Sequence, residues 1–300
     1  MSTLIFITLT GLALAAMYFL LAAGLSLIFG LMGVLNFAHG AFFTWGAYAA
    51  WWAIAWLTPA GGDTSTGIFL LSVVIAALAG GLLAALTEVA LLRPLYRRPI
   101  FQVLVTLGAG LALSELTAVI WRNDAKPFPQ PAWMAATLTI AGARVPANRL
   151  VLIVAAALVL GLMLAFLRYT RYGLIVRAGA ENREMVQALG IDVGRAFTLV
   201  FALGGALAGL GGAFGGAYFR SIDPSFGSVN LIFAFIVVVI GGLGSIGGSA
   251  LAAVLIGLTQ QYANYYGSLA LGGTWLGDFV VVILLAIVLL VRPRGLLGGH

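Results

Sequence analysis

An asparagine and a histidine lie three residues apart in a part of the chain that is otherwise apolar. The stretch GVLNFAHGAFF covers residues 33–43, and residues 4–58 around it contain no Lys, Arg, Asp or Glu. Asn36 and His39 can both donate and accept hydrogen bonds, and at a spacing of i, i+3 they are expected to share one helix face. Such groups either satisfy the backbone at a helix break or line a polar path through a membrane. The residues leave both interpretations open.

A second apolar segment is interrupted by glycines in the other half of the chain. Residues 231–261 are apolar except for the run GGLGSIGG at 241–248, and residues 30–40 form the matching interruption. Paired interruptions in two halves of a chain point to a transport site. Residues 231–240 would reach only about 15 Å as a helix, half a bilayer, which predicts a re-entrant or broken pair. The predicted path residues are Asn36, His39, Gly40, Glu115, Gly241, Gly242, Gly244 and Ser245.

Three acidic residues lie in or beside apolar segments. Glu115 is deep in its segment and shares a helix face with Arg122, about 10 Å away. It either belongs to a structural network or lines the path. Glu88, one turn from Arg93, and Asp278, at the start of the last apolar segment, are predicted to lie at the membrane interface.

A short amphipathic helix is predicted within the polar segment that follows residue 168. Glu181 and Glu184 come early, where carboxylates favour a helix N-terminus, and Gly190 is a natural helix stop. An apolar face between them includes Met185 and Leu189. The helix either rests on the membrane surface or docks onto a cytoplasmic partner by laying this face in a groove.

Residue types exclude several classes of enzyme. The chain has no cysteine, so disulfides and cysteine metal sites are not expected. Its only lysine, Lys126, precedes Pro127, whereas a nucleotide-binding Walker A loop needs Lys before Ser or Thr. His39 is the only histidine besides the last residue, so a histidine metal site or a catalytic triad is not expected either. The sequence therefore predicts no enzyme, metal or cofactor.

Composition places most of the chain in lipid. Of the 300 residues 62% are hydrophobic and 8% are charged, while a soluble domain carries about 25% charged residues. The net charge of +6 comes from basic residues between apolar segments, which indicates membrane orientation rather than nucleic-acid binding.

The apolar segments predict an all-α, polytopic helical bundle that forms a single domain over residues 1–300, with a cytoplasmic loop at 168–195. About eight spans result, depending on how the glycine-broken region is counted. The predicted spans are residues 4–29, 37–57, 68–92, 101–121, 150–167, 196–219, the broken region 231–261, and 279–291. Glycines within them are mostly expected to let helix backbones approach closely.

Basic residues predict the orientation of this bundle. Residues 93–99, 168–195 and the C-terminus together hold ten Arg, while the opposite loops hold five Lys or Arg. Because positive charge marks cytoplasmic loops, we expect an outside N-terminus, an outside loop at 58–67 and a cytoplasmic C-terminus.

An ordered set of motifs along the whole chain resembles the LivH-type permeases of branched-chain amino acid ABC importers. The motifs are GLSLIFGLMGVLNFAHGAFFTWGAY, RPLYRRP, TLGAGLALSE, KPFP, ENREMVQALGI and VVVIGGLGSIGGSALAAVLIGL. Glu184 and Gly190 also match the spacing of the ABC-importer coupling loop, although Met185 and Val186 replace its alanine pair. Ala41 stands where the family usually has an acidic residue.

The resemblance implies a multi-pass permease subunit in a bacterial inner membrane. It implies a second related permease, two cytoplasmic ATP-binding subunits and a periplasmic substrate-binding protein as partners. Coupling to the ATPase would involve Glu181, Glu184, Met185, Leu189 and Gly190. The expected substrate is a branched-chain or other hydrophobic amino acid. The related urea and short-amide permeases share much of the pattern, and a self-sufficient secondary transporter is the alternative from another class.

Overall fold

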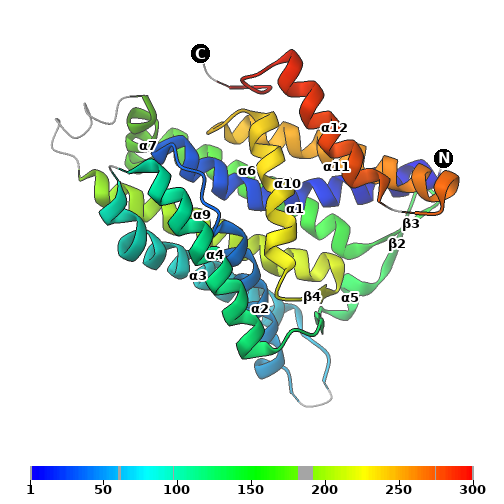
Figure 1. The fold of residues 1–300 in the computed structure, drawn as a ribbon. Coiled ribbons are helices and arrows are strands. Elements are labelled where there is room, and N and C mark those ends of the chain that lie inside the picture. Colours follow the sequence, from blue (N-terminus) through cyan, green and yellow to red (C-terminus); the bar gives the residue numbers. More distant parts are fainter. Residues whose placement is uncertain (1, 60–61, 97, 182–191, 274, 299–300) are drawn as a thin grey trace.

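The computed structural model describes residues 2–59, 62–96, 98–181, 192–273 and 275–298. In the described residues the fold is a bundle of helices with two small strand pairs (Figure 1). The helices are α1 (Ser2–Met32), α2 (His39–Leu57), α3 (Thr66–Thr87), α4 (Pro99–Trp121), α5 (Ala132–Ala135), α6 (Ala147–Tyr169), α7 (Arg171–Glu181), α9 (Val193–Phe219), α10 (Phe226–Gly241), α11 (Ile246–Leu271) and α12 (Leu276–Val291). A π-helical turn (Glu88–Leu92) and a 3-10 turn (Arg93–Leu95) continue α3.

Helices α1 and α9 form the centre of the bundle. About two thirds of the most apolar part of α1 is buried (67%), against 17% for α4. The helix pairs in closest association are α3 with α9, α1 with α11, and α2 with both α3 and α9. Since α4 and α6 expose most of their apolar surface, they lie at the periphery, where they can face lipid or another subunit.

Small residues along α9 allow it to pack tightly against its neighbours. A Cβ on Gly209 would overlap the carbonyl oxygen of Ala76 on α3, and a Cβ on Gly212 would overlap that of Phe43 on α2. Such contact lets van der Waals packing replace the missing hydrophobic drive between helices in lipid. The predicted role of these glycines in helix packing is confirmed.

Five described helices are long and apolar enough to cross a membrane, or six crossings result when the bent pair α10–α11 is one span. The five are α1, α3 with its continuation, α4, α6 and α9. Helix α12 has only 16 residues, and four tryptophans lower the hydropathy of α2. The predicted all-α membrane fold is confirmed, whereas the count of eight spans is not.

The polar segment between α4 and α6 contains secondary structure that the sequence did not predict. Strands β2 (Thr137–Ile140) and β3 (Ala143–Pro146) form a hairpin whose two turn residues, Ala141 and Gly142, both have positive φ. Strand β1 (Lys126–Pro127) pairs with β4 (Ser221–Ile222), which follows α9. The pairing places residues 122–149 and the α9–α10 connection on the same side of the bundle.

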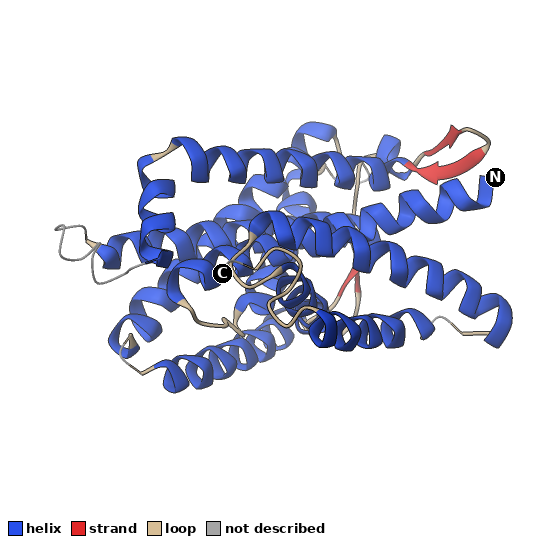
Figure 2. Ribbon diagram, turned by 90° about the horizontal axis from the view of Figure 1, so that it is seen from above, coloured by secondary structure: helices blue, strands red, loops and turns tan. Residues whose placement is uncertain are grey.

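The molecule is elongated, and its two ends differ. The N-terminus and the β2–β3 hairpin lie at one end (Figure 2), and α7 lies at the opposite end (Figure 1). At the hairpin end, Trp133 Nε1 donates a hydrogen bond to Thr66 Oγ1 over 2.8 Å, which ties this segment to the start of α3. Segments that the charge pattern assigns to one side of the membrane are therefore adjacent in the structure.

Candidate functional site

Asn36 lies in the break between α1 and α2 and organises the start of α2. Gly33 begins the break with a φ of 66°. The fully buried Asn36 accepts a hydrogen bond at Oδ1 from the backbone N–H of Ala38 over 3.1 Å, and its carbonyl accepts from the N–H of His39 over 3.3 Å. These bonds satisfy groups that the break leaves free. The expectation that Asn36 and His39 share a helix face was wrong, because Asn36 precedes the helix and His39 is its first residue.

His39 connects the start of α2 to the middle of α1. Its ring Nε2 lies 3.0 Å from the carbonyl oxygen of Leu21, and because a carbonyl can only accept, Nε2 is the donor. The imidazole is fully buried. It fits there because Gly24 has no side chain: a Cβ on Gly24 would come within 2.9 Å of the ring.

The second break also has the predicted form. Helices α10 and α11 meet at an angle of 119°, and Gly242 and Gly244 adopt φ of 101° and 82°. Ser245 caps α11, because its Oγ accepts from the N–H of Gly248 over 3.1 Å. The predicted broken or re-entrant pair is confirmed.

The two breaks touch each other. A Cβ on Gly30, near the end of α1, would lie 3.2 Å from the Cα of Gly244. The C-terminal residues cover the second break, since the N–H groups of Leu296 and Leu297 bond to the carbonyls of Ile240 and Gly241 over 2.7 and 3.0 Å. The glycine interruptions of the two halves thus form one site, where backbone rather than side chains makes the contact.

Of the two remaining predicted path residues, one lines a nearby cavity. Gly40 lines an apolar cavity of about 220 Å³ between the start of α2, α4 and α10, together with Ser114, which was not predicted. Glu115 does not line this cavity and is exposed on α4. No hydrogen bond or ion pair joins it to Arg122 or to another residue of the part of the chain that the structure describes.

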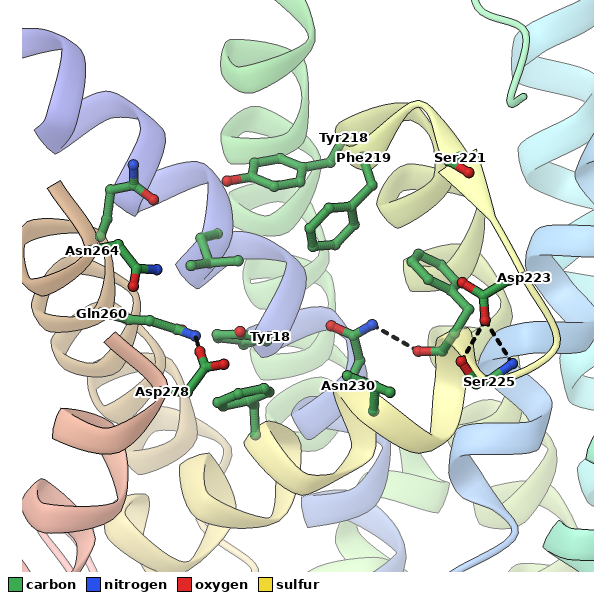
Figure 3. A pocket seen from close by; sticks show the side chains of 15 residues that line it. Tyr18, Tyr218, Phe219, Ser221, Asp223, Ser225, Asn230, Gln260, Asn264 and Asp278 are labelled. Atoms are coloured by element: carbon green, nitrogen blue, oxygen red, sulfur yellow. Dashed lines mark hydrogen bonds between the residues drawn. The ribbon is translucent and has the colours of Figure 1, made fainter. Parts of the chain in front are cut away.

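A larger cavity of about 560 Å³ lies between α1, the end of α9, α10, α11 and α12 (Figure 3). One wall carries the polar side chains Gln260, Gln261, Asn264 and Asp278. Aromatic rings, among them Tyr18 and Phe233, also line the cavity. Tyr18 lies between the Gln260–Asp278 pair and Asn230 (Figure 3). A concave apolar site with a few convergent polar groups is the usual form of a small-molecule site.

Sequence reasoning missed what two acidic residues contact. Asp278, expected at the membrane interface, has an exposed side chain and lines the large cavity. Glu88 was also expected there but is fully buried, where it accepts hydrogen bonds from Tyr96 and, over 2.6 Å, from Thr198 on α9. A carboxylate within a π-helical turn that is bonded to another helix is a signal only the three-dimensional structure provides.

The predicted coupling segment is only partly described. Glu181 is the last described residue of α7, so it follows helical residues instead of opening a helix as expected. Glu184, Met185, Leu189 and Gly190 lie outside the described residues. Asp192 is the next described residue, and its Oδ1 accepts from the N–H of Arg195 over 3.2 Å and caps α9. This segment therefore leads directly into a central helix.

Comparison with known proteins gives matches over nearly the whole chain. The LivH permease protein of the high-affinity branched-chain amino acid transport system of Salmonella typhimurium is 29% identical over 295 residues, covering 96% of this chain and 93% of its own. BraD of Pseudomonas aeruginosa is 29% identical over 294 residues, covering 96% and 94%. LivM of Salmonella typhimurium is 27% identical over 308 residues, covering 93% and 67%. No solved structure matches the chain.

The family profile gives the same answer. It spans residues 7–289 and therefore includes both breaks, the large cavity and the segment between α7 and α9. Its members are transport permeases, not enzymes. This chain belongs to the family of permease components of branched-chain amino acid transport systems.

Proposed function

We propose that the chain is the inner-membrane permease subunit of an ATP-driven importer for branched-chain or other hydrophobic amino acids. The observation that carries the proposal is the contact between the two glycine breaks, within a chain that matches this family from residue 7 to residue 289. Helix breaks with backbone contact at one site suit a path that opens and closes. The cavity of about 560 Å³, with both polar and aromatic walls, suits a small amphipathic substrate.

The energy for transport would come from other chains. Because the only lysine precedes a proline, this chain lacks a Walker A loop, so ATP must be bound by separate cytoplasmic subunits. The match to LivM over 93% of this chain supports a second, related permease as the partner within the membrane. Two ATP-binding subunits and a periplasmic substrate-binding protein complete the proposed assembly.

Reconstitution tests this proposal. The permease pair with its ATP-binding subunits is placed in proteoliposomes, the binding protein is added outside and ATP is enclosed. We expect uptake of radiolabelled L-leucine that requires both ATP and the binding protein. Uptake driven by a proton or sodium gradient without ATP would instead identify a secondary transporter. Strong competition by urea or acetamide, with none by leucine, would identify a short-amide permease.

A further inference from the structure

We propose that the cavity between α1, α10, α11 and α12 holds the ammonium group of the transported amino acid, with Asp278 and Gln260 as its acceptors. This inference rests on the proposed function, since it assigns a binding site to that substrate. The ligand class is a zwitterionic amino acid with an apolar side chain. No residue of this cavity was among the path residues predicted from the sequence.

Two hydrogen-bond acceptors in this cavity lack donors. Gln260 Nε2 donates to Asp278 Oδ1 over 2.6 Å (Figure 3), which fixes both side chains. Gln260 Oε1 is buried without a partner, whereas Asp278 has an exposed side chain whose Oδ2 receives no hydrogen bond from the described residues. A buried acceptor without a donor costs free energy until a ligand supplies one. An ammonium group carries three donors and a positive charge, so it satisfies both acceptors at once.

The charges around the cavity also favour a positively charged group of the ligand. Its described lining includes two carboxylates and no Lys or Arg. Asp223, the second carboxylate, already accepts from the backbone N–H of Ser225 over 2.8 Å and from its hydroxyl. Both bonds end on Oδ1, so each carboxylate keeps one oxygen without a donor from the described residues. Asp278 is the one that is hydrogen-bonded to Gln260, and it stands in the first turn of α12.

The other walls fit the remainder of such a ligand. Tyr18 and Phe233 stack with ring centroids 5.1 Å apart, and Leu14 and Phe219 extend this apolar surface. A branched aliphatic side chain buries its surface well against aromatic rings. Asn264 uses its Oδ1 to accept from the N–H of Gly277 over 2.8 Å, which leaves its amide nitrogen as a donor for the ligand carboxylate.

Thiol protection in the assembled importer tests the inference. Val229 lines the cavity and is 54% exposed, and because the chain has no cysteine, Val229→Cys gives a single reporter when the partner subunits are also cysteine-free. The labelling rate with a small maleimide is measured in proteoliposomes without the binding protein. The probes are L-leucine, 3-methylbutylamine, which lacks the carboxylate, and 4-methylpentanoate, which lacks the ammonium group.

We expect L-leucine and 3-methylbutylamine to slow labelling, and 4-methylpentanoate to be at least about tenfold less effective. Asp278→Asn should raise the leucine concentration for half protection by about ten- to a hundredfold, because a charge-assisted hydrogen bond is lost. Asp278→Glu should recover part of the protection. Asp63→Asn, at an exposed carboxylate in the loop before α3, is the matched control and should leave protection unchanged.

Three outcomes would overturn the inference. They are no protection by any probe, equal protection by 3-methylbutylamine and 4-methylpentanoate, and a leucine concentration for half protection that is unchanged in Asp278→Asn. An unchanged melting temperature of Asp278→Asn separates loss of binding from loss of folding. Leucine uptake by the unmodified importer is measured in parallel. If the importer takes up leucine with ATP but leucine does not protect the thiol of Val229→Cys from the maleimide, only the proposed binding site is wrong. If no hydrophobic amino acid is taken up, the proposed function is wrong.

Discussion

Single polar side chains hold the α1–α2 junction together. Asn36 satisfies the N–H of Ala38, and His39 reaches across to the carbonyl of Leu21 on α1. Both residues are fully buried, and neither lines the smaller cavity beside the junction or the larger cavity. The geometry therefore favours a structural role for these two side chains, while the adjacent Gly40, which lines the smaller cavity, stays a predicted path residue.

Replacement of Asn36 tests this role. Asn36→Ala removes the side-chain acceptor of the turn that precedes α2, and loss of such a hydrogen bond costs about 1 kcal/mol of stability. We expect Asn36→Ala to lower the melting temperature of the purified permease. Asn36→Ser keeps an acceptor and should lower it less. Thermal unfolding followed by fluorescence-detected gel filtration measures both. Normal stability of Asn36→Ala together with lost uptake would instead favour a direct role in the path.

Alanine substitution at two glycines distinguishes the effect of close helix packing on stability from the effect of helix propensity. Gly209→Ala would place a Cβ against the backbone carbonyl of Ala76, which cannot move aside as a side chain can, and overpacking of this kind costs about 1–3 kcal/mol. Gly161→Ala meets no atom within 4 Å and gains helix propensity, so it is the control. We expect Gly209→Ala alone to lower the melting temperature. Equal melting temperatures would show that α9 and α3 are not as close in the membrane as in this structure.

The sequence patterns predicted the positions of the helix breaks well, but they did not predict which polar residues contact each other. The breaks at Gly33 and Gly242 follow from glycines within apolar runs, so their positions could be predicted. The pair Gln260 and Asp278 could not, because it joins two helices without a recognisable spacing. Each residue alone is typical of a membrane interface, and only the packing of α11 against α12 turns them into one wall of a cavity.

At the element scale, α9 connects the predicted coupling segment to the core. It starts just after the residues that the structure does not describe, and Thr198 in its second turn bonds to the buried Glu88 at the end of α3. Farther along, α9 packs against α1, α2 and α3. A displacement at its start would thus act on α1, which lines the larger cavity, and on α2, which lines the smaller one.

A double substitution tests coupling through this segment. We expect Glu184→Lys with Gly190→Val to reduce substrate-stimulated ATPase activity at least about tenfold, because it reverses a charge and removes a predicted helix stop. Pull-down of the ATP-binding subunits and ATPase assays in proteoliposomes measure the effect. Asp63→Lys with Gly67→Val makes the same two changes near the start of α3 and should preserve coupling. Full ATPase activity and uptake in the first variant would place the coupling elsewhere.

At the scale of the whole molecule, the difference from eight spans comes from α2 and α12, whereas the bend between α10 and α11 determines the course of the broken region. The two helices turn by 119°, so α11 does not simply continue the crossing that α10 begins. Asp278 at the start of α12 lines the same cavity as Ser221 in β4, which precedes α10. The chain therefore returns toward the side from which α10 starts, and α12 leaves from there. A hydrophobicity pattern alone cannot distinguish this return from a full crossing.

The orientation of the bundle in the membrane is a separate prediction, because adjacency of loops does not tell which side is outside. Ten Arg in the segments assigned to the cytoplasm, against five Lys or Arg opposite, predict that residues 58–67 and 122–149 lie outside. Strand pairing of β1 with β4 and the bond from Trp133 to Thr66 require these segments to share one side, whichever it is.

Cysteine labelling in intact cells decides between the two orientations, and the chain offers a background without native cysteine. Asp63→Cys and Asp124→Cys introduce thiols at exposed positions of the two segments, and Tyr169→Cys does so at the end of α6, where the side chain is 77% exposed. A membrane-impermeant maleimide should label the first two from outside and the third only after the membrane is opened. The reverse pattern would invert the topology, and different sides for residues 63 and 124 would contradict the fold itself.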